Sequence, residues 1–411
     1  MTDIIVSNIK TYIKMQANKS ILIFGVGELQ KSIIKRAQQR GLYVIGIDPS
    51  DNAQCRNLVD AFEIVDGQDF EGTIAVAKKY HISALVTAAT DKPLRMMARV
   101  ANKLKLPFFS EETAQISTDK YLMKKCFQKN GIPCAKGKII ESIDDTNELS
   151  YPLIVKPRDN SGSRGVKLCY NKQDLQEALK EALKFTCQKS ILVEEFIEGK
   201  EYSIEALHYE GINQIIQFTE KKVTPFPYNV ELGHIQPANL AVTDKDKLTT
   251  IINTIGRAFK FENCASHTEV KINSQGIFVI ETSPRLGGDY ITSLLVPLST
   301  GINIEDCLLD IALKEKIIIP QNISHKSSGV RFFSLKGKSV NSISTQIQRV
   351  PKWNNLIHFS LKLKPNDIIP SITSSLSRYG EFIVQTDSYD TTKSLLDKYE
   401  KQISDLISTN N

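Results

Sequence analysis

The chain has 411 residues, of which 41% are hydrophobic and 24% charged, a composition typical of a folded globular protein. At roughly 150 residues per domain, this length predicts two or three domains. The 21 glycines and 15 prolines are too few for a collagen-like or disordered chain. No apolar run approaches the roughly 18 residues that a membrane helix needs, and charged residues interrupt the first twenty positions. We therefore expect no membrane partner and no signal peptide.

The formal net charge is +6, and residues 331–411, with 11 basic and 7 acidic residues, contribute +4 of it. No basic cluster occurs there, so we expect no nucleic-acid partner. The seven cysteines are scattered and form no Cys-x-x-Cys pair. This pattern indicates reduced thiols in the cytoplasm and argues against disulfides or a zinc site.

Residues 1–112 alternate apolar strands with helical patterns, which predicts a first domain built on a parallel sheet with both faces covered. A Gly25-x-Gly27 pair follows the first strand, and Asp48 lies about twenty residues further on, as in dinucleotide-binding loops. Gln30 stands where such loops need a third small residue. We therefore expect the fold without an NAD site, and an NAD-dependent oxidoreductase remains an alternative.

Two more domains are expected, at 113–328 with a division near 190, and at 329–411. The fold class is α/β, with α+β character in the central part. The central domain is expected to contain a helix that Asp119 opens, several strands, an antiparallel pair that turns at Gly211 and a long amphipathic helix at 243–261.

The most informative stretch is a predicted hairpin around the loop 274–276. Pairing Asn273 with Ile277 places Glu269 opposite Glu281, and directly opposite residues share a face with β-carbons roughly 5 Å apart. The other face would carry a set of core residues, Val270, Ile272, Phe278 and Ile280.

Two facing carboxylates repel each other unless a cation lies between them, and Mg²⁺ prefers hard oxygen ligands. Glu269, Glu281 and the Ser283 hydroxyl therefore form a candidate metal site. Arg285 and the backbone amides of Gly287 and Gly288 follow directly, and such groups stabilise negative charge that develops in a transition state.

Upstream, a strand ends in Lys156 and leads into a Ser- and Gly-rich loop at 158–165. Small residues let backbone amides approach phosphate oxygens, and the candidates there are Ser161, Ser163 and Gly165. A second strand runs into backbone that can bond an adenine edge, at Glu194, Glu195, Phe196 and Ile197. Glu201 follows a glycine turn and is placed to accept hydrogen bonds from ribose.

Together these motifs resemble the ATP-grasp enzymes, a superfamily that includes biotin carboxylase, carbamoyl-phosphate synthase, D-alanine–D-alanine ligase and the L-amino acid ligases. The resemblance covers nearly the whole chain and implies a Rossmann-like front domain, a central ATP-grasp domain and a small C-terminal α+β domain. It implies ATP and Mg²⁺ (or Mn²⁺) as cofactors. Lys120 and Lys156 would reach the phosphates, residues 194–197 would bind adenine, and Arg285 would face an acyl-phosphate. Ser283 departs from the family, which usually has Asn there.

Within the superfamily, the chain is most similar to L-amino acid ligases, on the segments 231–237, 285–289 and 330–333. Glu231, His234 and Arg331 are the candidate substrate residues. The resemblance implies an ATP-dependent carboxylate–amine ligase that forms an amide bond through an acyl-phosphate and releases ADP and phosphate. Its substrates would be an amino acid or a similar small carboxylate, and an amine.

Other functions stay open: a bicarbonate-using carboxylase, a purine-biosynthesis type of ligase, or a non-catalytic nucleotide-binding module, which only Ser283 supports. Relatives are often dimers, so a homodimer is also open.

Overall fold

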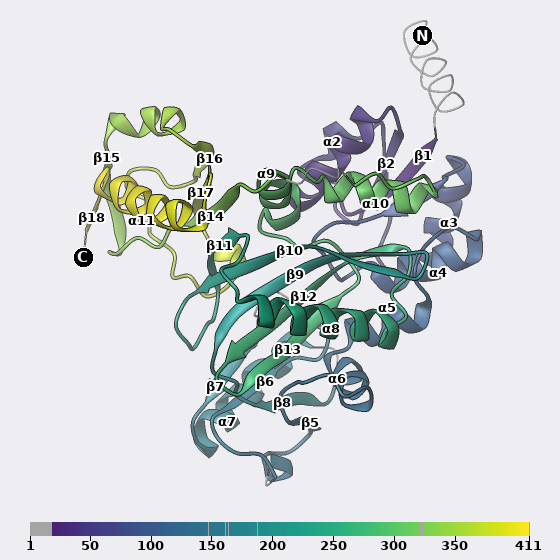
Figure 1. Cartoon of the computed structure of the whole chain (residues 1–411), viewed down its shortest axis with the longest axis horizontal. Coiled ribbons are helices and arrows are strands. Elements are labelled where there is room, and N and C mark those ends of the chain that lie inside the picture. The colour runs from purple at the N-terminus through teal and green to yellow at the C-terminus, as the bar shows by residue number, and fades with distance from the viewer. Residues whose placement is uncertain are drawn as a thin grey trace, which may run out of the picture.

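The computed structural model describes residues 19–410, apart from 147, 161, 163, 187 and 320–323. Ser161 and Ser163, which we expected at the phosphates, lie outside the described residues. In the described part the strands form four sheets, and the helices pack around them (Figure 1). None of the helices described is both long and apolar enough to cross a membrane.

The front region has a four-stranded parallel sheet in the order β3-β2-β1-β4. Alternate residues of β1 belong to two different cores, Ile21 and Ile23 to one and Leu22 and Phe24 to the other, so both faces are buried as predicted. Helix α2 contributes to the first core, and α3 and α4 contribute to the second. The elements are β1 (Ser20–Phe24), α2 (Lys31–Gln39), β2 (Tyr43–Asp48), β3 (Ala61–Ile64), α3 (Phe70–Lys79), β4 (Ala84–Val86) and α4 (Leu94–Leu104).

The backbone amides of the glycine-rich loop in this region all donate hydrogen bonds to acceptors within the region itself. Each of the four N–H groups from Gly25 to Glu28 donates to a group of the same region, and the acceptors are Ile47 O, Asp48 Oδ2, Gln30 Oε1 and Gln54 Oε1. The Gln30 amide also donates to Ala88 O at 2.6 Å. A pyrophosphate would need those donors, and a ribose would need the Asp48 carboxylate. The backbone donors of the loop are therefore engaged within the front region.

A small antiparallel sheet in the order β5-β8-β6-β7 follows. Helix α6 begins after its N-cap Asp119, as predicted, and α7 begins after Asn171. Leu175 and Ala178 of α7 pack against the buried face of this sheet. The elements are α5 (Glu111–Thr118), α6 (Lys120–Lys129), β5 (Gly137–Ile140), β6 (Leu153–Lys156), β7 (Lys167–Cys169), α7 (Lys172–Ala182) and β8 (Ile191–Glu195).

The largest sheet has eight strands in the order β13-β12-β9-β10-β11-β14-β17-β16, and α8 packs against it (Figure 1). The antiparallel pair β9–β10 turns at Gly211, as predicted. This part comprises β9 (Lys200–Tyr209), β10 (Ile212–Val223), β11 (Glu231–Gln236), α8 (Val242–Ala258), β12 (Cys264–Asn273), β13 (Gly276–Ser283), α9 (Val296–Thr300) and α10 (Ile304–Leu313).

The last strands of the chain extend this same sheet. The domain limit that we expected at residue 328 falls inside β14, and β14, β17 and β16 continue the sheet beyond β11. Helix α11 packs against β14 and β17. The elements are β14 (Ser327–Phe332), β15 (Ser339–Ile343), β16 (Leu356–Leu361), β17 (Gly380–Thr386), α11 (Tyr389–Asp405) and β18 (Ile407–Asn410).

Candidate active site

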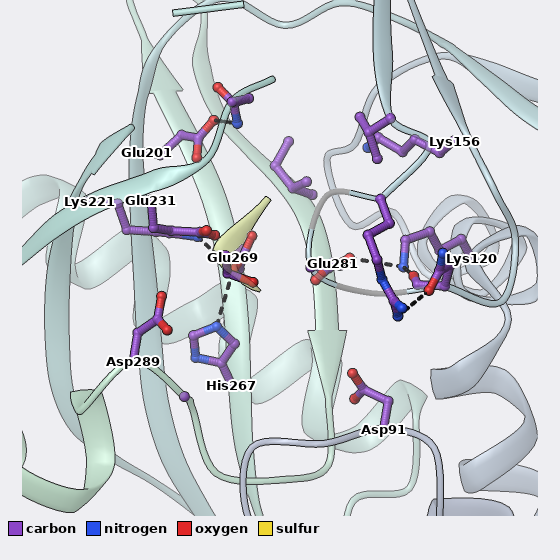
Figure 2. Close-up of a pocket in the computed structure, with 18 of the residues that line it drawn as sticks. Asp91, Lys120, Lys156, Glu201, Lys221, Glu231, His267, Glu269, Glu281 and Asp289 are labelled. Atoms are coloured by element: carbon purple, nitrogen blue, oxygen red, sulfur yellow. Dashed lines mark hydrogen bonds and ion pairs between the residues drawn. The ribbon is translucent and has the colours of Figure 1, made fainter. Parts of the chain in front are cut away.

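A cavity of about 480 Å³ lies between the small sheet and the large sheet, and the front region also contributes to its wall. The front region supplies the loop 89–92 after β4, and the C-terminal region supplies a turn at 375–376. Figure 2 shows that acidic and basic side chains converge on this cavity from several strands. It is the natural place to look for the predicted residues.

The two predicted carboxylates do face each other across the β12–β13 hairpin. Glu269 pairs directly with Glu281, as predicted. The expected register of the turn is wrong, because Asn273 pairs with Gly276 and not with the residue after it. A β-bulge between the two pairings, with Ile280 as the extra residue of β13, brings the carboxylates back into register.

The bulge also changes which side chains enter the core. Ile277 and Val279 are buried there with Val270, whereas we expected Phe278 and Ile280. Ile280 instead lines the cavity. One extra residue moves the following side chains to the opposite face, because the side-chain period of a strand is two.

Each of the two carboxylates has a lysine partner. The Lys221 Nζ lies 2.6 Å from Glu269 Oε1, and the Lys120 Nζ lies 3.2 Å from Glu281 Oε2 (Figure 2). Burial disfavours the ionised form of Glu269, but Lys221 outweighs burial and holds the pKa of this carboxyl well below its usual range. Glu269 is therefore available as an anionic oxygen donor, and Lys120 lies beside Glu281 as its counter-charge.

These donors suit Mg²⁺ only together with a phosphate. Among the described residues, no group of three or more acidic, histidine or cysteine side chains could enclose a metal ion. Mg²⁺ is commonly held by one or two carboxylates plus substrate phosphates and water. Glu269 and Glu281 supply that number of carboxylates, so the residues fit a metal that binds with a nucleotide.

A buried histidine, His267, contacts the Glu269 carboxylate. His267 Nδ1 lies 2.6 Å from Glu205 Oε1, and His267 Nε2 lies 3.2 Å from Glu269 Oε1. Although burial lowers the pKa of His267, Glu205 and Glu269 outweigh it and raise the pKa to about 9. The imidazolium therefore bridges a fully buried carboxylate and a candidate metal ligand.

The buried Glu205 carboxylate also accepts a hydrogen bond from one of the backbone amides that we predicted to bind an anion. The Gly287 N–H donates to Glu205 Oε2 at 3.3 Å, so the prediction that this amide stabilises a transition state is wrong for this conformation. A β-carbon at Gly287 would lie 2.8 Å from both Glu205 Oε2 and His267 Nδ1, which explains the need for glycine. Gly288 lines the cavity.

Ser283 and Arg285 both contact Asp91 in the front region. The Ser283 hydroxyl donates to Asp91 Oδ1 at 2.5 Å and is engaged there, away from the role of metal ligand that we predicted. Arg285 binds both Asp91 oxygens, at 2.8 and 3.0 Å. Burial raises the pKa of Asp91, but Arg285 outweighs it and lowers the pKa to about 2. Arg285 lines the cavity and joins it to the front region.

At the other end of the cavity, Lys156 and Glu194 form a buried pair. Glu194 lies between Lys156, at 2.7 Å, and Lys124, at 2.5 Å. The Glu194 carboxylate therefore positions Lys156. This role is additional to the contact with adenine that we expected from the Glu194 backbone. The Glu195 carboxylate accepts the Ser150 N–H at 3.0 Å.

The predicted adenine and ribose residues line an aromatic and charged wall. The Phe196 ring packs edge-on against Phe226 at 5.0 Å, and Lys271 lies over Phe196 at 4.6 Å. Glu201 accepts from Asn229 at 2.9 Å and pairs with Lys271 at 3.3 Å. Ile197 lines the same wall.

The predicted phosphate loop is only partly at the cavity. Asn160, Gly162 and Arg164 line it, and the Lys120 Nζ donates to Asn160 O at 2.9 Å. Gly165 has a left-handed backbone with φ of 74° and lies against Pro157. Its contribution is to the shape of the loop.

Two of the three predicted substrate residues line the cavity and the third does not. Glu231 lies 3.4 Å from Lys221. His234 is 1% exposed; its Nε2 lies 3.5 Å from Asp289 Oδ2, and its Nδ1 has no hydrogen-bond partner among the described residues. The prediction for Arg331 is wrong, because its guanidinium turns to α11 and pairs with Asp397 and Glu400, both at 2.9 Å.

Sequence reasoning missed several residues of the site. Asp91 follows the carboxyl end of β4, where polar residues of parallel sheets often gather, so its position was a usable signal. His267 lies two residues before Glu269 on β12, and Lys221 pairs with His234 across β10 and β11. Strand alternation could therefore have indicated that both side chains face the cavity. Glu205 shares strand parity with Glu201, and Asp289 ends the segment 285–289, but nothing in the sequence indicated their partners His267 and Arg378.

Comparison with known proteins agrees with this geometry. Residues 149–293 match the model of the ATP-grasp domain. The chain is 24% identical over 238 residues to the carbamoyl phosphate synthase large chain of Clostridium acetobutylicum, covering 52% of this chain and 21% of that one. It is 25% identical over 268 residues to the alanine–anticapsin ligase of Bacillus amyloliquefaciens, covering 59% and 56%. The chain thus spans about half of that ligase and a fifth of the synthase.

Among solved structures, the L-amino acid ligase from Bacillus licheniformis superposes with a TM-score of 0.81 at 21% identity, covering 96% of this chain and 99% of that one. Similar structures also include a phosphoribosylglycinamide synthetase and a biotin carboxylase, so the similarity establishes the fold and leaves the substrate class open. The domain match over residues 149–293 and the shared structure therefore establish an ATP-grasp fold for this chain.

Proposed function

We propose that this protein is an ATP-dependent ligase that joins a small carboxylate, such as an amino acid, to an amine through an acyl-phosphate. The observation that carries the proposal is the cross-strand pair Glu269 and Glu281, which meets Lys120 and Lys221 in one cavity. Phosphoryl transfer depends on positioning and charge stabilisation, and these residues supply both without a nucleophilic side chain.

In the first step, ATP would bind along the aromatic wall with its ribose at Glu201. The carboxylate substrate attacks the γ-phosphorus, the bond to the β,γ-bridging oxygen breaks, and ADP leaves. Lys156 and Lys120 offset the charge of the phosphates. Mg²⁺ held by Glu269 and Glu281 would supply further charge neutralisation when bound.

In the second step, an amine attacks the acyl carbon and phosphate leaves, with loss of a proton from the amine. Arg285 follows β13 and lines the cavity; Asp91 and Leu286 O hold its guanidinium in place, and the fixed cation can stabilise the oxyanion through its charge. His234 is buried beside the same space with its Nε2 3.5 Å from Asp289 and its Nδ1 unpartnered among the described residues, so a substrate polar group would complete its hydrogen bonding.

The front-region loop favours an unphosphorylated substrate over a ribonucleotide. All four amides from Gly25 to Glu28 are engaged within the front region, so this loop offers no backbone donors to a substrate phosphate. This observation supports an amino acid ligase over the purine-biosynthesis type. The six described cysteines are free thiols, which fits a cytoplasmic enzyme.

A panel of amino acids, tested alone and in pairs, with and without bicarbonate, would test the proposal. We expect ADP release that needs two amino acids and yields a dipeptide detectable by mass spectrometry. ADP release that requires bicarbonate would identify a carboxylase instead. Substituting Glu281→Gln should reduce ADP formation by about 100-fold or more. Glu71→Gln, on the exposed surface of α3, is the matched control and should leave the rate unchanged.

A further inference from the structure

The loop that follows β13, residues 285–290, is fixed by contacts to three separate parts of the chain. Arg285 binds Asp91 of the front region, and the Gly287 N–H donates to Glu205 of β9. The end of the loop is tied to the C-terminal region, residues 329–411. This loop carries Arg285, which the proposed function places at the acyl group, and Gly288, which lines the cavity.

The C-terminal tie is a partly buried ion pair between Asp289 and Arg378. The two guanidinium nitrogens of Arg378 donate to the two carboxylate oxygens of Asp289, at 2.7 and 2.5 Å. The Arg378 guanidinium also stacks on the Phe332 ring, 3.7 Å from its centroid, and its side chain is 10% exposed. Bidentate geometry and stacking together fix Arg378 in one orientation.

Backbone strain shows that the end of the loop depends on such contacts. Asp289 and Tyr290 are consecutive non-glycine residues in the left-handed region, with φ of 52° and 65°. This conformation is costly for residues with a β-carbon and persists where surrounding contacts enforce it. Tyr290 has its own tie to the same region, because its hydroxyl donates to Glu381 Oε1 at 2.9 Å.

Direct substrate binding by Arg378 is disfavoured by the same geometry. Both edge nitrogens of the guanidinium are taken by Asp289, and its Nε donates to Ser375 O at 3.0 Å. Asp289 lines the cavity, while Arg378 is absent from the described residues that do. Arg378 therefore reaches the cavity through the residues it holds: the Asp289 carboxylate, and the backbone carbonyls of Ser375 and Glu231.

We propose that Arg378 is a positioning residue: by holding Asp289, it fixes the backbone of the loop 285–290, so that the acyl-binding groups take their reactive geometry only while the C-terminal region is docked. This inference rests on the proposed function for its catalytic part. The part that concerns loop order stands on the contacts alone.

The experiment compares Arg378→Gln and Arg378→Lys with Arg349→Gln, an exposed arginine of the same region. Hydrogen exchange of a peptide that spans 285–290, measured on the free protein, should rise by about tenfold in Arg378→Gln. Arg378→Lys keeps the charge without the bidentate contact, so its exchange should be intermediate. Arg349→Gln should match the wild type.

With an acid–amine pair that supports turnover, Arg378→Gln should lower kcat by about 100-fold, the scale expected when reacting groups are misplaced by an ångström. The KM for ATP should stay within about twofold, because the nucleotide wall is untouched. The amount of amide product per ADP should also fall, since water competes when the loop is loose.

The inference is overturned if Arg378→Gln matches Arg349→Gln in exchange, or if activity falls only in proportion to folded protein with an unchanged product-to-ADP ratio. If no amino acid pair supports turnover in the wild type, the proposed function fails. The exchange measurement still decides whether Arg378 orders the loop.

Discussion

The buried histidine at the site predicts a loss of stability at alkaline pH. His267 lies between Glu205, which is fully buried, and Glu269, and its own side chain is 7% exposed. Its pKa is raised to about 9 from an ordinary value of 6.5. Protonated His267 therefore stabilises the folded protein, and this contribution is fully present below pH 6.5 and is lost as the pH rises through about 9.

The size of the effect follows from the two pKa values. At about 1.4 kcal/mol per pH unit, the rise from 6.5 to about 9 corresponds to about 3 kcal/mol of unfolding free energy. Between pH 6.5 and 9.5 the wild type should lose most of this amount. His267→Gln cannot be protonated, so it should be less stable than the wild type at pH 6.5 and should approach it as the pH rises.

Urea unfolding at several pH values, in the presence of EDTA, measures this difference. His325→Gln, which changes an exposed histidine, is the control and should follow the wild-type curve. A direct check is the NMR titration of His267, for which we expect a midpoint near 9 in the metal-free protein. Parallel curves for the wild type and His267→Gln over this interval, or a midpoint below 7, would refute the reasoning.

Three further predictions concern single residues of the site. Gly287→Ala places a β-carbon 2.8 Å from Glu205 Oε2, so urea unfolding should show a loss of about 1–3 kcal/mol, whereas Gly288→Ala, whose nearest contact would be at 3.4 Å, should be tolerated. Arg331→Met should leave every KM within about twofold in steady-state kinetics, since the side chain faces α11, and a large rise in a substrate KM would restore the original assignment. Arg285→Ala should lower turnover by about 100-fold with little effect on ADP affinity by calorimetry, and full activity would remove it from the mechanism.

The parts of the site that could be predicted from the sequence are those that depend on local patterns, such as strand alternation and helix capping. Glu269 and Glu281 lie twelve residues apart on one hairpin, so the pattern predicts that they pair, although the β-bulge at Ile280 is needed to reach that pairing. The helix after Asp119 begins where its capping side chain predicts. Local patterns fix neighbours in the chain, so they predict elements and the contacts within a hairpin.

The contacts that could not be predicted join residues distant in the chain. Asp91 meets Arg285 and Asp289 meets Arg378, across 194 and 89 positions, and neither pair shares an element. The bulge at Ile280 is a further case, because an extra residue in a strand leaves no mark on composition. Ion pairs between domains depend on how the domains dock, which periodicity does not describe.

Arg331 shows why strand parity alone cannot assign a side chain to a site. All six residues of β14 are buried, since α11 covers one face and the segment 291–300 packs on the other. Because both faces of β14 are buried, strand alternation predicts that Val330 and Arg331 point in opposite directions. It does not predict which of the two side chains faces the cavity. An arginine among apolar neighbours looked like a substrate ligand, yet its charge is balanced by α11 carboxylates some 66 positions away. In the same C-terminal region, Arg378 pairs with Asp289, a residue that lines the cavity in the loop after β13. Assigning a charged residue to a site therefore requires knowing which carboxylate it pairs with, and that pairing is a property of the assembled fold.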